Sequence, residues 1–301
     1  MTAVPLRPDE GISLRRPILV CAFEGWNDAG DAATSAVEHL ESVWGAEPVA
    51  AIDPDEYYDF QVSRPTVSLI DGHTRKITWP TTRFTVCPLP GTDRDLVLVR
   101  GLEPNMRWRG FCQELLAIAV ELGVELVVTL GALLADSPHT RPVPVSGTSS
   151  DPELAARLGL EPSRYEGPTG IVGVFQDICE RAGLPAVSFW AAVPHYVAQP
   201  PCPKATVALL HRVEDLLDSP VPMTDLAERA RAWERQVDEL AAEDSDVAEY
   251  IATLEQREPE EDLPEASGEA IAKEFERYLG RRDDSCRAAG RSWWLGGCLG
   301  G

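Results

Sequence analysis

A short polar loop in the middle of the sequence has residue types that could carry acid–base chemistry. Residues 136–142 place a carboxylate, an imidazole and a guanidinium close together, on Asp136, His139 and Arg141. General acid–base catalysis needs a group that titrates near neutral pH, and His139 is such a group. The loop lacks a complete catalytic set, so the alternative is that its polar side chains pin a proline-rich segment through backbone hydrogen bonds.

Arg141 is the residue of this loop whose role can be tested most directly. Its guanidinium could hold the loop through carbonyl oxygens, with Asp136 as an available partner, or it could offer two parallel donors to an anion. We favour the structural role because Asp136 stands so close in the sequence. Replacement of Arg141 by alanine is then expected to lower the melting temperature.

A glycine-bearing turn at residues 24–31 leads into a predicted helix and is the second candidate. Its side chains of interest are Trp26, Asn27, Asp28 and Asp31. The amino end of a helix exposes unpaired N–H groups that can bind an anion. Asp28 and Asp31 bring negative charge themselves, however, and Asp is a usual capping residue. We therefore favour capping, and the spacing is not that of a dinucleotide fingerprint.

Two further segments could border the same crevice. Residues 165–173 form a glycine-rich bend before an apolar helix, and no lysine lies nearby to serve a nucleoside triphosphate. The side chains of interest in this bend are Tyr165, Glu166 and Thr169. His195 and Tyr196 follow a predicted strand and could line the same crevice, although we favour a structural hydrogen bond as the role of His195. Ligands of open α/β sheets bind beyond the carboxyl ends of the strands, which is where we place the candidate crevice.

No metal site or cofactor is expected. The five histidines are scattered, and none belongs to an H-x-x-x-H or H-E-x-x-H unit. The seven cysteines contain no C-x-x-C pair, which argues against a zinc ribbon and against a disulfide framework, so most of them should be buried. Serine hydrolysis loses its main support because the sequence has no G-x-S-x-G elbow.

The composition limits the partners and the location. The 301-residue chain has a formal net charge of −22, and the resulting field repels nucleic acid in the absence of a basic stripe. The first twenty residues lack the pattern of a signal peptide, and no apolar run is long enough to span a bilayer. We therefore expect a cytoplasmic protein that binds neither nucleic acid nor membrane.

Predicted strands and helices alternate along most of the chain. Non-alternating apolar runs at residues 17–23 and 126–130 are typical of strands covered on both faces in a parallel sheet. Asp71-Gly72 predicts a hairpin between residues 66–70 and 77–79. A long loop is expected after Gly131. Further strands are predicted at residues 49–52, 82–89, 96–99 and 186–190, and further helices at residues 171–182 and 205–217.

The alternation predicts an α/β protein with a mostly parallel sheet and helices on its faces. An appended helical hairpin is predicted where Ala, Glu, Arg and Leu become frequent, and one of its helical faces is marked by Leu226, Ala230, Trp233, Val237 and Leu240. The expected segments are an N-terminal extension (1–16), an α/β sandwich domain (17–221), the helical hairpin (222–257), an acidic linker with a short helix (258–280) and a tail without order (281–301).

Four phrases of the sequence resemble the bacterial, actinobacterial-type branch of the proteasome assembly chaperone 2 family. They are FEGWNDAGDAA at residues 23–33, GALLADSPHTRPVPV at 131–145, YEGPTGIVG at 165–173 and WAAVPHYV at 190–197. The resemblance spans about residues 17–254. It implies a three-layer α/β/α sandwich similar to the nucleoside phosphorylase fold, which agrees with the alternation of strands and helices.

The resemblance also implies a function. Eukaryotic members pair with a partner chaperone, help to assemble the proteasome α-ring and present C-terminal tails to pockets between subunits. This chain is therefore expected to be a binding or assembly protein that forms homo-oligomers, a trimer by fold resemblance, and that binds proteasome subunits. Its ending, Leu299-Gly300-Gly301, lacks the hydrophobic-Tyr-x pattern of a docking tail.

Two enzyme functions stay open as alternatives. In a small-ligand enzyme of nucleoside phosphorylase-like type, Arg141 and the helix start after Thr169 would bind phosphate, and Glu166 or His195 would stabilise the leaving base. Some bacterial members of the family have been labelled ATP-grasp-like carboxylate–amine ligases. The scarcity of lysine, with three in the chain, disfavours that function.

Overall fold

The computed structural model describes residues 13–163, 165–197 and 199–257. Within this part, residues 13–163 and 169–257 form one compact unit, and residues 165–168 belong to a second one. The predictions of an acidic linker, a short helix and a tail without order concern residues 258–301, which lie outside the described residues.

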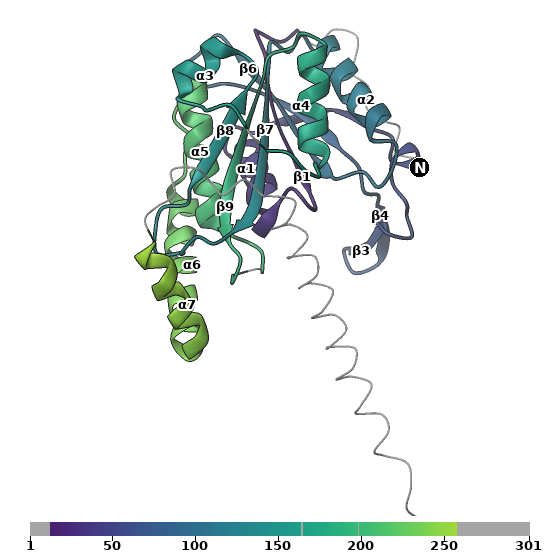
Figure 1. The fold of residues 1–301 in the computed structure, drawn as a ribbon. Helices are drawn as coiled ribbons and strands as arrows, with labels where there is room; N and C mark the ends of the chain where they lie inside the picture. The colour runs from purple at the N-terminus through teal and green to yellow at the C-terminus, as the bar shows by residue number, and fades with distance from the viewer. Residues whose placement is uncertain (1–12, 164, 198, 258–301) are drawn as a thin grey trace, which may run out of the picture. The chain divides into compact units, whose positions relative to one another are not determined.

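A seven-stranded mixed sheet forms the centre of the larger unit, with strand order β2-β5-β6-β1-β7-β9-β8 (Figure 1). Strands β6, β1, β7 and β9 run parallel, so their carboxyl ends meet at one edge, which we call the carboxyl edge. Both β2 and β6 are antiparallel to β5, so β2 ends at the same edge. The strands are β1 (Ile18–Glu24), β2 (Glu47–Ala51), β5 (Arg83–Pro88), β6 (Asp95–Leu102), β7 (Leu126–Ala135), β8 (Val145–Ser149) and β9 (Ala186–Pro194).

Helices on both faces of the sheet explain the continuous apolar run of β1. Leu19 and Phe23 lie in the core that α2 and α4 cover, whereas Val20 and Ala22 lie in the core that α1 and α5 cover. A strand buried on both faces needs apolar residues at every position. The three-layer α/β/α architecture is therefore confirmed (Figure 1). These helices are α1 (Ala32–Val43), α2 (Trp108–Glu121), α4 (Ile171–Arg181) and α5 (Pro203–Leu217).

Two central strands are longer than their sequence patterns predict. β7 and β9 pair in register from Val127 with Ala186 to Ala135 with Pro194, so each continues beyond the predicted end. The long loop predicted after Gly131 is thus wrong in its first part, because pairing with a neighbouring strand extends β7. Further along, edge strand β8 pairs antiparallel to β9, and helix α3 (Pro152–Leu158) follows it; neither was predicted.

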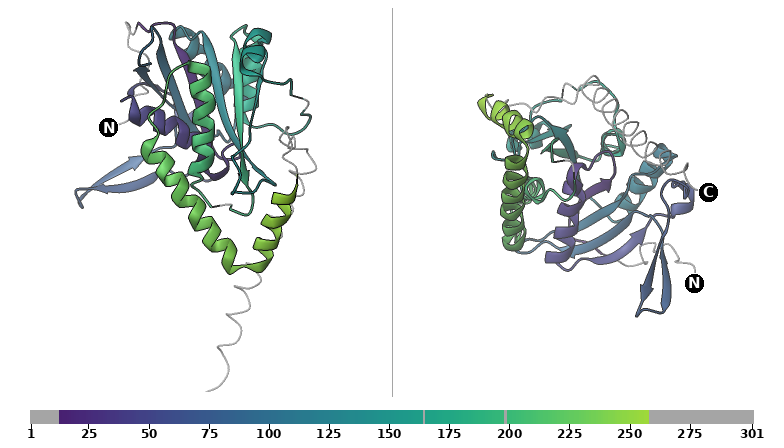
Figure 2. Two further views of the ribbon diagram at one scale, coloured as in Figure 1. Left: turned by 90° about the vertical axis from the view of Figure 1, so that its left-hand side faces the viewer. Right: turned by 90° about the horizontal axis from the view of Figure 1, so that it is seen from below.

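The predicted hairpin is confirmed, and it forms a small sheet of its own. β3 (Thr66–Ile70) and β4 (Thr74–Thr78) pair with each other across Asp71-Gly72. The hairpin lies within the connection from β2 to β5 and projects away from the central sheet (Figure 2). Because β2 ends at the carboxyl edge, the connection that carries the hairpin leaves from that edge.

Helices α6 (Thr224–Glu243) and α7 (Ser245–Gln256) form a V-shaped pair (Figure 2). α6 packs on α5, and its buried face includes Trp233 and Val237, which the helical spacing predicts. The chain reverses at Asp244, whose carboxylate caps α7 by accepting the Asp246 N–H at 2.9 Å. In the described part of the chain, no helix is both long and apolar enough to cross a membrane.

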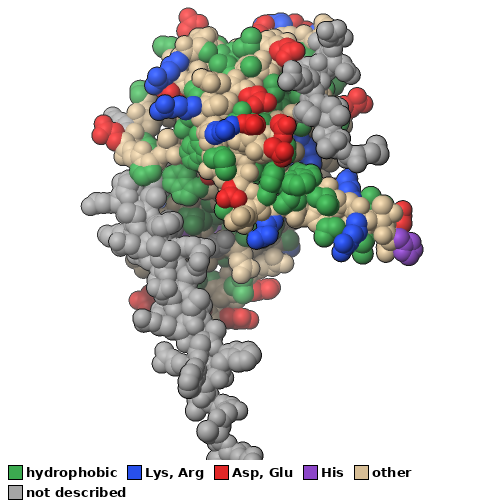
Figure 3. Space-filling view, turned by 90° about the vertical axis from the view of Figure 1, so that its right-hand side faces the viewer, with side chains coloured by type: hydrophobic (Ala, Val, Ile, Leu, Met, Phe, Trp, Pro, Cys, Tyr) green, Lys and Arg blue, Asp and Glu red, His purple; other side chains and the backbone are tan. Residues whose placement is uncertain are grey.

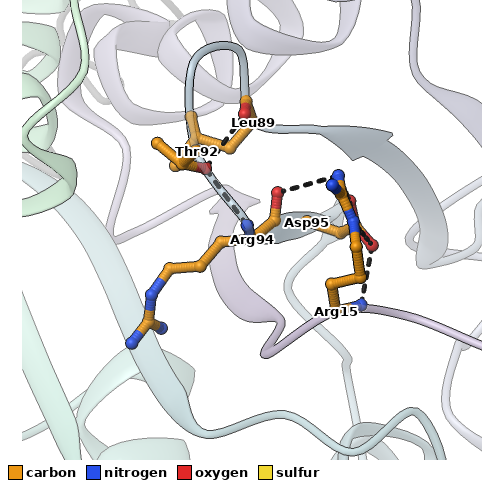
Figure 4. A network of polar contacts seen from close by, with 5 residues as sticks. All are labelled: Arg15, Leu89, Thr92, Arg94 and Asp95. Atoms are coloured by element: carbon orange, nitrogen blue, oxygen red, sulfur yellow. Dashed lines mark hydrogen bonds and ion pairs between the residues drawn. The ribbon is translucent and has the colours of Figure 1, made fainter.

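An ion pair between Arg15 and Asp95 holds the segment that precedes β1 (Figure 4). Arg15 Nη2 lies 2.6 Å from Asp95 Oδ1, and the Arg15 backbone N–H donates to Oδ2 at 2.7 Å. Burial alone would raise the pKa of Asp95, but the hydrogen bonds from Arg15 outweigh it, so the pKa lies below its ordinary value. In the adjoining turn, the Thr92 hydroxyl donates to the Leu89 carbonyl and accepts from the Arg94 N–H.

Cysteines in the described residues are core residues with free thiols, as predicted. Cys21, Cys87, Cys112, Cys179 and Cys202 are all buried. Burial raises the pKa of the Cys21 thiol well above its ordinary value, so this thiol is not a reactive thiolate at neutral pH. Cys286 and Cys298 lie outside the described residues.

Candidate functional site

The predicted site residues fall mainly into two groups at the carboxyl edge. The β1 cluster consists of Asn27 and Asp28, after β1, with Glu103, after β6. The β7–β9 cluster consists of Asp136, His139, Arg141, His195 and Tyr196, after β7 and β9. No hydrogen bond or ion pair joins the two clusters within the described residues.

Asp28 caps helix α1. Its carboxylate accepts the Ala33 N–H at 2.7 Å and the Thr34 N–H at 3.3 Å, and it also accepts the Thr34 hydroxyl. Burial raises the pKa of Asp28 to about 6, although the hydrogen bonds from Thr34 and Ala33 act in the opposite direction. The capping role is thus seen for Asp28, whereas Asp31 is exposed and its side chain makes no capping hydrogen bond.

Asn27 and Glu103 join the ends of β1 and β6 to the start of α4. The Asn27 amide donates to Glu103 Oε1 at 2.8 Å, and the same oxygen accepts the Ile171 N–H at 2.9 Å. A carboxylate of the chain itself therefore occupies the helix start that could have received an anion. A Cβ atom at Gly170 would collide with Asn27 Oδ1, so glycine is required there for close packing.

The other predicted residues near this edge are less buried. Trp26 is 51% exposed, and Thr169 is exposed, with its hydroxyl 3.5 Å from the Gly170 carbonyl. Tyr165 and Glu166 belong to the second unit, in which the Tyr165 hydroxyl donates to the Pro168 carbonyl at 2.7 Å.

His139 is buried and bonded through both ring nitrogens. Its Nδ1 lies 2.8 Å from the Tyr196 hydroxyl, which also accepts the His139 backbone N–H at 2.7 Å, and its Nε2 lies 2.9 Å from the Asp238 carboxylate of α6. Burial raises the pKa of Tyr196 to about 12, so its hydroxyl keeps its proton at neutral pH. In a neutral imidazole, Tyr196 therefore donates to Nδ1, and the proton on Nε2 is donated to Asp238.

Lys204 at the start of α5 adds another connection to this loop. Its ammonium group donates to the His139 carbonyl and, at 2.6 Å, to the Glu234 carboxylate of α6. The His139 residue is thus tied to α5 and α6 through its backbone and its ring.

Arg141 holds the C-terminal end of α7. Its Nη1 donates to the Arg257 carbonyl at 2.9 Å, and its Nη2 donates to the Glu255 carbonyl. The last carbonyls of a helix lack partners within the helix and carry the negative end of its dipole, so a guanidinium is favourable there. Arg141 thus contacts carbonyl oxygens, as the structural alternative expects, but these belong to α7, and Asp136 is not among its hydrogen-bond partners in the described residues.

Asp136 makes contacts with β9 and α7. Its Oδ1 lies 3.3 Å from His195 Nδ1, at ion-pair distance but without hydrogen-bond geometry, and its Oδ2 lies 3.6 Å from the Arg257 guanidinium. Tyr250 of α7 packs edge-on against the His195 ring, with centroids 5.2 Å apart. Burial and the neighbouring Asp136 carboxylate raise the pKa of Tyr250 to about 12.

A hollow of about 270 Å³ lies between this loop and the two helices. Alanines of α6 and α7 line much of it, and its polar side chains include His139 and Asp238, which are bonded to each other. The lining residues offer an apolar surface and side chains that already have partners. This arrangement fastens two helices to the sheet.

Sequence reasoning missed the partners that lie on distant elements. Glu103 could have been found, because it directly follows β6 at the edge where ligands of α/β sheets bind. Asp238 and Tyr250 have no such signal. They lie in amphipathic helices, where a polar residue is expected anywhere on the outer face.

The family model of the PAC2 family matches this chain over residues 22–241. The chain belongs to the PAC2 family. The resemblance seen in the four sequence phrases is therefore confirmed. A comparison with curated proteins found no match.

Solved structures of PAC2 proteins share sequence and fold with this chain. A PAC2 family protein from Streptomyces avermitilis is 65% identical, with a TM-score of 0.74, and a proteasome-assembly chaperone homologue from Mycobacterium tuberculosis is 60% identical, with a TM-score of 0.72. Each similarity covers 78% of this chain and 99% of the other. An archaeal proteasome activator from Pyrococcus furiosus, 20% identical, shares the fold with a TM-score of 0.62 over 79% of this chain and 97% of its own.

The PAC2 match includes the β1 cluster, the β7–β9 cluster and Asp238. Tyr250, Glu255 and Arg257 lie beyond residue 241, where the match ends. The contacts of Asp136 and Arg141 with α7 therefore involve a part of this chain that the PAC2 model does not reach.

Proposed function

We propose that this PAC2 protein is an assembly protein that binds other subunits in the manner of the proteasome assembly chaperones. Its family supports this function, and so does the name of its relative from Mycobacterium tuberculosis, a proteasome-assembly chaperone homologue. One observation carries the proposal against an enzyme: three of the groups at the carboxyl edge that could serve catalysis, Arg141, His139 and Glu103, have internal partners. Arg141 binds carbonyls of α7, His139 bridges Tyr196 and Asp238, and Glu103 occupies the start of α4.

Proteasome α-subunits are the proposed partners, and a binding experiment tests this part. The tagged full chain is mixed with unassembled α-subunits, and a protein of similar size and acidity serves as the control. We expect α-subunits to be retained by this chain well above the control. Equal retention by the two proteins would remove the chaperone role and leave the family and the fold untouched.

Self-association is the second part of the proposal. Members of an assembly machine commonly form closed symmetric oligomers, and a trimer is the state that the fold resemblance implies. Size-exclusion chromatography with light scattering at micromolar concentration measures the mass. A single peak at the monomer mass of 32.9 kDa would end this part.

A small-ligand enzyme is the second candidate function, and one feature of the β1 cluster favours it. Asn27 is 1% exposed, and its Oδ1 has no hydrogen-bond partner among the described residues. A buried amide oxygen without a partner could accept from a donor of a nucleoside-like ligand. A thermal-shift assay with nucleosides, bases, phosphate and ATP tests the phosphorylase-like and the ligase-like alternatives together. Absence of stabilisation by all of them would count against both.

A further inference from the structure

The β3–β4 hairpin has one apolar face, and that face is exposed to solvent. Residues directly opposite each other in an antiparallel pair share a face. Val67 pairs with Ile77, and Leu69 pairs with Arg75, so these four side chains lie on one face. Val67, Leu69 and Ile77 are 58%, 60% and 58% exposed. The other face is mostly polar: its residues are Thr66, Ser68, Ile70, Thr74, Lys76 and Thr78.

A two-stranded hairpin of this kind is poorly suited to stand alone. Isolated hairpins are at best marginally stable in water, and they gain stability when a hydrophobic face packs against another element. All residues of β3 and nearly all of β4 are exposed, so the central sheet does not provide that packing. An exposed apolar face beside polar residues is the usual mark of an interaction surface.

The hairpin is also basic in an acidic protein. Residues 64–78 contain three basic side chains and one acidic one, a formal charge of +2 in a chain of −22. Figure 3 shows blue and green side chains along the projecting hairpin. Within the part of the chain that the structure describes, neither Arg75 nor Lys76 is in an ion pair. The partner surface that fits is therefore acidic with exposed apolar side chains.

Helices α6 and α7 have that chemistry. Residues 224–256 contain ten acidic and three basic side chains, a formal charge of −7. Glu239 and Glu243 are exposed and have no ion-pair partner among the described residues, and Leu240 beside them is 63% exposed. The helix pair contacts the β7–β9 side of the sheet, whereas the hairpin leaves from the β2–β5 side. The two surfaces of one copy lie apart (Figure 2).

We propose that the β3–β4 hairpin of one copy docks on α6 and α7 of a second copy. This rests on the proposed self-association and names the surfaces that produce it. Two different surfaces meet in such a head-to-tail contact, and it closes into a ring when the rotation between copies allows. A hairpin-to-hairpin contact would bring Arg75 and Lys76 of two copies together against their mutual repulsion. Nucleic acid and anionic lipid are disfavoured as partners because the whole chain repels them.

Charge reversal at exposed positions tests the proposal in the full chain. The hairpin variant carries Arg75→Glu and Lys76→Glu, and the helix variant carries Glu239→Lys and Glu243→Lys. We expect each variant alone to lose self-association and to elute at the monomer mass. A combined variant that carries all four changes should regain the larger mass, because the reversed hairpin of each copy then meets the reversed positions of the helix pair on its neighbour in a ring of any size.

The control matched to the helix variant carries Glu121→Lys and Glu161→Lys, the same charge change as in that variant, at two exposed positions outside the hairpin and the helix pair. It should keep the mass of the unmodified chain, and melting curves verify that all variants are folded.

Leu69→Asp provides a second test of the apolar face, with loss of self-association expected. Wild-type mass in both reversal variants, or a combined variant that stays monomeric, overturns the hairpin contact while self-association of the unmodified chain stands. A monomeric unmodified chain overturns both. If the hairpin variant keeps the mass of the unmodified chain but loses binding to anionic vesicles or to α-subunits, the hairpin surface serves that other partner and the contact between copies is overturned.

Discussion

Individual residues at the carboxyl edge combine burial with hydrogen bonding, and the balance between the two can be measured. Asp28 is 4% exposed and still accepts three hydrogen bonds from the first turn of α1. Loss of hydration disfavours the carboxylate, whereas the donors favour it. Burial is the larger effect, since the pKa of Asp28 is raised from 3.8 to about 6.

The first prediction concerns Asp28→Asn. Because the folded state holds the Asp28 proton up to about pH 6 and the unfolded state releases it near 3.8, ionisation of Asp28 opposes folding as pH rises between these values. A shift of about two pH units corresponds to about 3 kcal/mol. The unfolding free energy of the wild type minus that of Asp28→Asn should therefore fall by up to about 3 kcal/mol as the pH rises from about 4 to about 6. Urea titrations across this range measure it. A difference between wild type and Asp28→Asn that stays flat across this pH range would refute the assignment.

Tyr196→Phe is the second prediction. The change removes the hydroxyl that accepts the His139 backbone N–H and contacts His139 Nδ1, so a buried donor loses its partner. An unsatisfied buried polar group costs about 1–3 kcal/mol, and we expect a loss of unfolding free energy in this range. Tyr250→Phe is the comparison. It removes a hydroxyl beside the half-exposed Asp136 carboxylate and should cost less. Equal losses in the two variants would contradict the central role of the Tyr196 hydroxyl.

At the scale of elements, the structure assigns the polar loop after β7 to the positioning of α7. Thr140 and Arg141 both contact the end of this helix, and Asp136 contacts Tyr250 and Arg257. α7 buries few side chains of its own, with Ile251 and Leu254 as its buried residues. Polar contacts therefore matter more for α7 than for the helices that cover the sheet.

Arg141→Ala is the third prediction. Two carbonyls at the end of α7 lose a charged donor, so we expect faster amide hydrogen exchange in α7 and a melting temperature lower by several degrees, while exchange in β1 stays slow. Arg231→Ala, at an exposed position of α6, is the control and should change neither. If Arg141→Ala keeps the wild-type melting temperature but loses a thermal shift that phosphate induces in the wild type, Arg141 has a ligand-binding role and the structural role is wrong.

Local patterns predicted the elements that depend on local chemistry. The apolar run of β1, the Asp71-Gly72 turn and the helical spacing of Trp233 and Val237 each gave the right element. The full lengths of β7 and β9 depend on pairing with each other, and edge strand β8 depends on a neighbour that no local pattern identifies. The same limit applies to the site. His139 was found as a polar residue after a strand, but its partner Asp238 lies 99 residues further along the chain.

At the scale of the whole molecule, charge has two opposing consequences. The net charge of −22 makes the chain repel itself, which works against its compact state. In the proposed assembly, the basic hairpin and the acidic helix pair attract each other between copies. Salt screens both interactions, since the Debye length is about 10 Å at 0.1 M and about 3 Å at 1 M ionic strength.

The last prediction follows from these opposite signs. Raising sodium chloride from about 0.05 M to about 0.5 M should increase the melting temperature of the Arg75→Glu and Lys76→Glu variant, because screening relieves repulsion within a monomer. The same change should lower the mass of the unmodified chain in light scattering, because screening weakens the contact between hairpin and helices. Salt does not weaken the burial of Leu69 and its apolar neighbours, so the self-association that remains at high salt is due to this apolar contact. A mass of the unmodified chain that grows with salt would mean that apolar contact alone drives the assembly and that the complementary charges of the two surfaces do not.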